Sequence, residues 1–142
     1  MWGYAAALWA FVFAVLHAVW AAGWYVLLPQ GEARGAFSRP WFRVYNLVVT
    51  GACLVAVLLA LALARPWGRR VPRLLLGSIA WVGTALLVLR GGGSLLQMAY
   101  LVITGRYFYQ PVHLYEMWFW LGAVLFSMTL LRLHRRGGPA PN

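Results

Sequence analysis

The sequence predicts an all-α integral membrane protein: a bundle of four transmembrane helices in one domain, residues 1–142. Three observations predict this class. First, the 142 residues are 63% hydrophobic and only 10% charged, whereas about 25% of a soluble domain is charged. Second, the mean hydropathy is +0.73. Third, the apolar residues fall into runs that approach or exceed the roughly 20 helical residues needed to cross a bilayer.

Four apolar runs predict the four spans. The expected spans are residues 4–28, 44–64, 74–90 and 111–133. Proline follows the first run, and the basic turn "RPWGRRVPR" follows the second, as breakers and positive charges are expected to do between membrane helices. A proline also opens the fourth run, and proline suits the first turn of a helix.

The third run meets three consecutive glycines, Gly91–Gly93, directly after Arg90. An unbroken helix from residue 74 to residue 104 would be about 46 Å long, whereas the hydrocarbon core is about 30 Å thick. Glycine is also a poor helix former. We therefore expect a Gly-broken third span, with a short interfacial or re-entrant helix at residues 95–104 before the fourth span.

The net charge of +10 comes from arginine alone, because the chain contains no lysine. The arginines lie between the apolar runs and not on one solvated face, which argues against a nucleic-acid partner and favours contact with membrane lipids. The end of the bundle that holds both termini has Arg65, Arg69, Arg70, Arg73, Arg132, Arg135 and Arg136, and the other end has Arg34, Arg39, Arg43, Arg90 and Arg106. Positive residues favour the cytoplasmic side. The end that holds both termini has seven arginines and the other end has five. This difference predicts cytoplasmic termini in a plasma membrane.

His17 lies in the first span, at a depth where ionisable residues are rare and are functional candidates by default. Helical spacing puts four aromatic residues on its face: Trp9, Phe13, Trp20 and Trp24. Such a face suits a flat lipophilic ligand, for example a sterol, a quinone or a porphyrin. The alternative is a neutral histidine that is hydrogen-bonded to another helix and packs the bundle.

His113 and Glu116 lie three residues apart at the start of the fourth span, and residues at this spacing are neighbours on a helix. A carboxylate beside an imidazole is an arrangement used in general acid–base chemistry. Alternatively, Glu116 complements the helix dipole or pairs with Arg90, since a charge that does not reach water needs an opposite partner. We expect the Arg90–Glu116 ion pair. Arg90, Tyr109 and Trp118 complete the candidate ligand-binding residues.

Three functions remain open. The leading hypothesis is a non-enzymatic membrane protein that holds a lipophilic small molecule, or a partner subunit or further copy of the chain, against the aromatic face of His17. The first alternative is an intramembrane enzyme for a lipid, sterol or isoprenoid substrate, with His17 and Glu116 as acid and base and His113 in support. The second is an accessory subunit of a respiratory or redox complex. No cofactor is identified, haem and quinone stay open, and no group of convergent ligands predicts a metal site.

Three stretches also resemble a known family. They are "HAVWAAGW" and "LP" within residues 17–29, "LRGGGS" at 89–94 and "YQPVHLYEMWFWLGAVLF" at 109–126. In these the chain resembles an uncharacterised family of small bacterial four-helix membrane proteins, catalogued as a domain of unknown function. That family shows His-x-x-Trp-Ala-x-Gly in its first helix, an Arg-Gly-rich break after the third and Tyr-x-Pro before the fourth. Many members have an acid where this chain has Ser94. The resemblance implies a multi-pass inner-membrane location and no particular activity.

Overall fold

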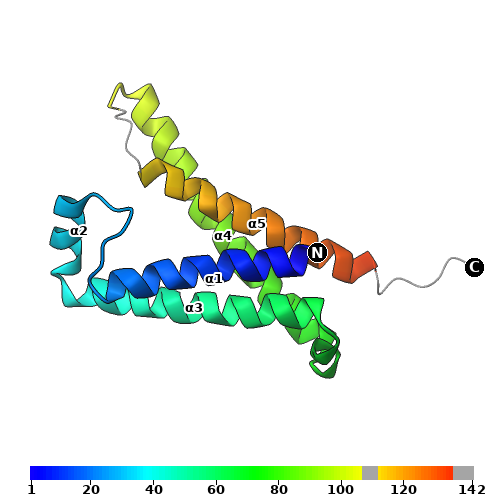
Figure 1. Cartoon of the computed structure of the whole chain (residues 1–142). Coiled ribbons are helices and arrows are strands. Elements are labelled where there is room, and N and C mark those ends of the chain that lie inside the picture. The colour runs from blue at the N-terminus through cyan, green and yellow to red at the C-terminus, as the bar shows by residue number, and fades with distance from the viewer. Residues whose placement is uncertain (107–111, 136–142) are drawn as a thin grey trace, which may run out of the picture.

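The computed structural model describes residues 1–106 and 112–135, with the side chains of all of these except residues 112–115 and 134–135. This part of the chain contains helices and no strand (Figure 1). The elements are α1 Trp2–Ala21, α2 Gln30–Phe37, α3 Pro40–Ala64, the 3₁₀ helix η1 Pro66–Arg70, α4 Arg73–Ile103 and α5 Val112–Arg135. Helices α1, α3, α4 and α5 are long and apolar enough to cross a membrane. The predicted all-α fold with four spans is confirmed.

The four long helices form two antiparallel pairs (Figure 1). Helix α1 packs along α3, α4 packs along α5, and α1 also contacts α5. Helices α3 and α4 touch much less, although η1 connects them directly. We call the end that holds the start of α1, η1 and the end of α5 the terminal end. The opposite end, where α2 lies, is the α2 end (Figure 1).

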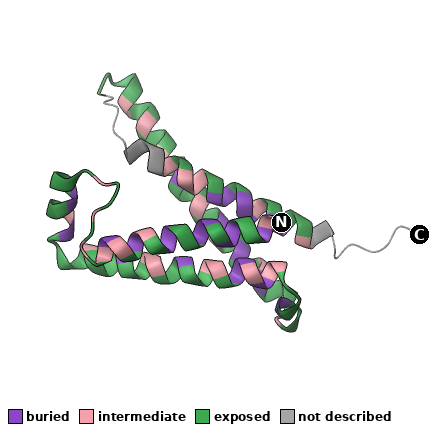
Figure 2. Ribbon diagram, in the orientation of Figure 1, coloured by how far each residue is buried: buried purple, intermediate pink, exposed green. Residues whose placement is uncertain are grey.

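Small side chains fill the places where the helices approach most closely. Ala6, Ala10, Ala60 and Ala80 are completely buried, and small residues let membrane helices pack backbone to backbone. Many outward-facing positions of the helices are instead exposed (Figure 2). They include many large apolar residues, for example Leu89, which is 71% exposed. Water disfavours such a surface and lipid accommodates it. The chain is therefore a membrane protein.

Helix α1 ends at Ala21, so the prediction that the first span continues to residue 28 is wrong. Gly23 has a φ of 96°, a conformation that glycine adopts at little cost. Its N–H and that of Trp24 donate to carbonyl groups in the last turn of the helix, which is the Schellman arrangement that closes a C-terminus. The glycine ends the helix well before the proline.

Helix α4 runs unbroken through Gly91–Gly93, so the predicted break and the separate helix at residues 95–104 are wrong. A glycine inside a helix costs about 1 kcal/mol relative to alanine, but an unpaired backbone group in lipid costs several kcal/mol. Continuing the helix therefore has the lower free energy. Packing also requires one of the glycines, because a Cβ at Gly91 would lie 2.9 Å from Trp120 Nε1. The helix ends at a second Schellman turn, where Gly105 has a φ of 65°.

Helix α2 lies in the connection between α1 and α3. Ala33 and Phe37 are buried one turn apart. The ring of Phe37 meets that of Phe42 in α3 edge to face at 4.8 Å. These contacts attach α2 to the beginning of α3.

Candidate functional site

The aromatic residues of α1 pack against α5. Trp9 Nε1 donates a hydrogen bond to the carbonyl oxygen of Trp118 at 3.0 Å, and the two indole rings stack with centroids 6.1 Å apart. Phe13 meets Phe119 edge to face at 5.5 Å. A Cβ at Gly122 would overlap the indole of Trp9, so this glycine gives the ring its place. The rings serve first as the joint between α1 and α5.

His17 is buried and forms a hydrogen bond across to α3. Its Nδ1 lies 2.8 Å from Oδ1 of Asn46, a residue that is only 1% exposed. Asn46 Nδ2 donates to the carbonyl of Phe42 at 2.8 Å, which orients the amide so that Oδ1 is the acceptor. The Nδ1 of His17 therefore carries the proton and donates it. This geometry agrees with the alternative in which His17 packs the bundle.

Fewer aromatic residues surround His17 than helical spacing predicts. The rings of Phe13 and Trp20 lie 4.6 and 4.9 Å from the imidazole. Trp24 follows the end of α1 and is 74% exposed. The prediction that Trp24 continues this face is wrong because the helix has already ended at Ala21.

Arg90 and Glu116 form the predicted ion pair, which joins α4 to α5. NH1 and NH2 of Arg90 donate to the two carboxylate oxygens of Glu116 at 2.9 and 3.1 Å. NH1 also donates to Ser94 Oγ, and the guanidinium carbon lies 4.8 Å from the ring centroid of Phe119. These contacts use three of the five N–H groups of Arg90. Tyr109 and the side chain of His113 lie outside the described residues.

An apolar cleft of about 520 Å³ separates α3 from α4. Its first wall is one face of α3, formed by Tyr45, Val49, Ala52, Cys53, Ala56 and Leu59. Apart from the adjacent pair Ala52 and Cys53, these positions recur at intervals of three or four residues, which is the spacing of one helix face. The cleft exists because α3 packs on α1, α4 packs on α5, and the two pairs diverge.

The second wall of the cleft is formed by α4, and aromatic rings form its floor. The α4 residues are Ala80, Gly83, Leu86, Leu87 and Arg90, and the floor holds Trp9, Phe13, Phe119 and Phe126. Arg90 lies ten residues beyond Ala80 in α4, a rise of about 15 Å. On the α3 wall, Leu59 lies fourteen residues beyond Tyr45, a rise of about 21 Å. The cleft thus extends over roughly half to two-thirds of a hydrocarbon core of about 30 Å, and it has one cationic side chain toward the α2 end.

The structure brings only some of the sequence candidates to this cleft. Trp9, Phe13 and Arg90 line it, whereas His17, Trp20, Glu116 and Trp118 do not. The sequence analysis did not predict the two walls of the cleft formed by α3 and α4. The sequence feature that could have indicated them is a set of small residues on otherwise bulky apolar helices, namely Ala52, Ala56, Ala80 and Gly83. Small side chains leave room between helices, but composition does not tell whether another helix fills that room.

The family comparison covers the elements that build the cleft. The family described as protein of unknown function (DUF3995) matches residues 10–126, from within α1 to within α5. No curated protein and no solved structure matches the chain. The chain therefore belongs to this family of unknown function, as the resemblance in its three sequence stretches predicted.

Proposed function

We propose that this protein is a non-enzymatic membrane protein that holds a lipophilic small molecule in the cleft between α3 and α4. The observation that supports this proposal is the cleft itself. Its volume of about 520 Å³ lies in the range of about 300–1,000 Å³ that is common for ligand pockets. Apart from Arg90 at one end, Tyr45 and Cys53, its lining residues are all apolar. An acyl or isoprenoid chain with a small polar head near Arg90 fits this distribution, and a quinone is one member of that class.

The shape of a hydrocarbon chain favours a small molecule over a helix from a partner subunit. A helix is about 10 Å wide with its side chains. A single acyl or isoprenoid chain is much thinner and can lie along the apolar walls of the cleft.

The acid–base enzyme is the less supported alternative. His17 is bonded to Asn46, and Glu116 is bonded to Arg90. Neither side chain lines the cleft. An acid and a base need direct or one-water reach to the same substrate, and the cleft offers neither residue to a molecule inside it.

We also infer that the protein lies in the inner membrane of a bacterium, with its terminal end in the cytoplasm. The family resemblance supports the bacterial membrane. The arginines that gather at the terminal end support the orientation, because positive residues favour the cytoplasmic side.

Ligand retention tests the proposal. We expect wild-type protein purified in mild detergent to retain one lipophile in native mass spectrometry, and the organic extract to identify it. Gly83→Leu should lose this molecule, because Gly83 lines the cleft and a Cβ there meets no atom within 4 Å. The larger side chain should then occupy the cleft itself.

Gly77→Leu is the matched control. Gly77 is also a glycine of α4 with no atom within 4 Å of an added Cβ, but it does not line the cleft. This variant should retain the molecule. A wild-type protein without ligand, or equal ligand content in the two variants, would contradict the proposal.

A further inference from the structure

A second hollow, of about 330 Å³, lies at the terminal end, where η1 turns the chain from α3 into α4. Three arginines line it, together with apolar side chains at the helix ends. These residues include Arg65, Arg69, Arg73, Leu63, Leu76 and Leu133. The hollow therefore combines positive charge with an apolar border at a boundary of the membrane-crossing segment.

The arginines of this hollow have no carboxylate side chain near them. The whole sequence contains two acidic residues. Glu32 belongs to α2 at the other end of the bundle (Figure 1), and Glu116 is bonded to Arg90. Several like charges at one site repel one another, so an anion from outside the chain would stabilise this end.

The basic turn is packed firmly onto α3. Gly68, in the middle of η1, is buried, and a Cβ at this position would overlap the carbonyl group of Ala62. Arg69 follows directly in the chain. Its backbone is thus fixed relative to the end of α3, which gives the hollow a defined shape.

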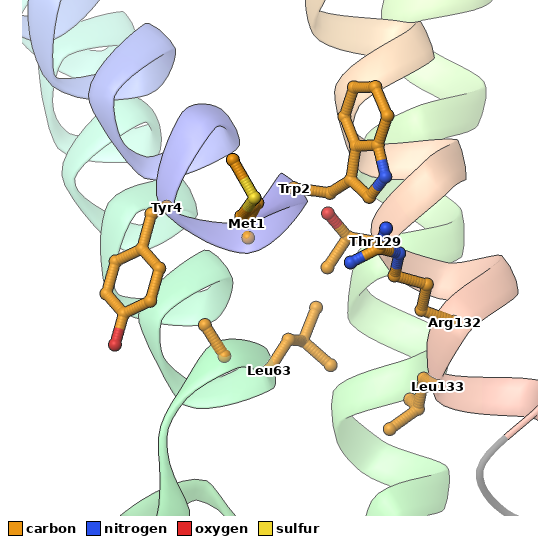
Figure 3. Close-up of a pocket in the computed structure, with 9 residues that line it drawn as sticks. Met1, Trp2, Tyr4, Leu63, Thr129, Arg132 and Leu133 are labelled. Carbon is orange, nitrogen blue, oxygen red and sulfur yellow. The ribbon is translucent and has the colours of Figure 1, made fainter.

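A smaller hollow continues the site toward α1. It shares Leu63 and Leu133 with the first hollow and is also lined by Trp2 and Arg132 (Figure 3). The guanidinium carbon of Arg132 lies 5.8 Å from the ring centroid of Trp2. A fourth cation therefore lies on the far side of the shared leucines.

We propose that the hollow at Arg65, Arg69 and Arg73 binds the phosphate of an anionic phospholipid head group. Guanidinium groups match phosphate oxygens in geometry and charge, and basic pockets between membrane helices are known to bind such head groups. The leucines at the border would contact the glycerol and the first carbons of the acyl chains. Free phosphate offers the same oxygens but would leave this apolar border uncovered, so a lipid is the better match.

The test is a binding titration of the full chain in detergent by native mass spectrometry. The probes are phosphatidylglycerol, phosphatidylcholine and inorganic phosphate. We expect phosphatidylglycerol to bind wild-type protein most tightly. Arg69→Gln should weaken this binding about fivefold, because it removes a direct hydrogen bond to the phosphate, and Arg69→Gln with Arg73→Gln should weaken it about tenfold or more. Arg69→Lys should fall between wild type and Arg69→Gln, because lysine keeps the charge but not the planar fork.

Arg70→Gln is the matched control for Arg69→Gln. Arg70 is the next residue of the same turn and has the same charge, but it does not line the hollow. Its loss should change affinity by less than about twofold. Thermal midpoints in detergent confirm that each variant is folded.

Three results would overturn the proposal. If Arg69→Gln and Arg70→Gln weakened phosphatidylglycerol binding equally, the lipid would be held by the general positive charge of the turn and not by a defined site. Equal affinity for phosphatidylcholine would remove the need for an anion. Displacement of phosphatidylglycerol by an equal concentration of inorganic phosphate would assign the hollow to a soluble anion.

Discussion

The hydrogen bond between His17 and Asn46 explains, without any ligand, a buried polar pair near the α2 end of the apolar bundle. A polar side chain in a membrane needs a bonding partner, and each residue provides one for the other across the α1–α3 contact. Asn46 also bonds the backbone of its own helix, so its amide is held in one orientation. The pair thereby fixes how α1 and α3 are placed along each other.

A double-mutant cycle on His17 and Asn46 measures this contribution. We expect Asn46→Ala to lower the free energy of unfolding by about 1–2 kcal/mol, because it removes a buried bond and leaves the imidazole N–H unpaired. Adding His17→Phe should cost less than the two single changes combined, with a coupling of about 1 kcal/mol, as found for hydrogen bonds between membrane helices. The measurement is unfolding in mixed micelles. Purely additive effects would mean that the bond does not stabilise the helix pair.

The ion pair between Arg90 and Glu116 could be predicted from the sequence because both residues are charged. The hydrogen bond between His17 and Asn46 could not. The chain has two acidic residues, so only Glu32 and Glu116 could pair with Arg90. This small number of candidates made the Arg90–Glu116 pair predictable. Asn46 is neutral and one of several uncharged polar residues in the spans. Its pairing with His17 depends on the rotation of α3 about its axis, which tertiary packing determines.

At the scale of the element, α4 shows that a run of glycines breaks a helix less readily in lipid than in water. Three glycines in a row indicate a break in a soluble protein, where water bonds the exposed backbone. Inside a membrane, the backbone must bond to itself, and the helix continues. The end of the first span was also misjudged for a local reason. Gly23 adopts a positive φ just after α1, and this C-terminal glycine signal is present in the sequence, but the boundary was placed at the later proline. The end of α4, where Gly105 has a positive φ, lies within one residue of the predicted helix end at residue 104.

Alanine substitutions in the glycine run test the continuous helix. Gly91→Ala should destabilise the protein, because its Cβ would lie 2.9 Å from Trp120 Nε1 and 3.0 Å from Trp120 Cε2. Gly92→Ala, whose Cβ meets no atom within 4 Å, should be neutral or stabilise by up to about 1 kcal/mol, since alanine is the better helix former. Thermal unfolding in detergent measures both. Clear destabilisation by Gly92→Ala would indicate that the glycines form a break after all.

At the scale of the whole molecule, the cleft and the hollow at the terminal end have a common origin. The turn η1 joins α3 to α4 at one end, and each helix then follows a different partner. The number of spans and their order could be read from the sequence because each span is a local apolar run. The divergence of the two pairs depends on contacts between residues far apart in the chain, such as Trp9 with Trp118, and no local pattern encodes it.

The distribution of arginine over the whole molecule gives a last prediction, the orientation in the membrane. Arg90 was counted with the α2 end, but it belongs to the α4–α5 contact and is not a loop charge. Among the described residues, the terminal end thus has six arginines, namely Arg65, Arg69, Arg70, Arg73, Arg132 and Arg135, and the α2 end has four, namely Arg34, Arg39, Arg43 and Arg106. Since loop arginines favour the cytoplasmic side, the terminal end should face the cytoplasm and its anionic lipids.

Single-cysteine labelling in intact cells measures this orientation. Cys53 is the one native cysteine and is replaced by alanine, after which Ser38→Cys reports the α2 end and Arg70→Cys reports the terminal end. Both positions are exposed. A membrane-impermeant maleimide should label Ser38→Cys in intact cells and Arg70→Cys only after permeabilisation. The reverse pattern would place the arginine hollow outside the cell, and the orientation derived from the arginines would then be wrong.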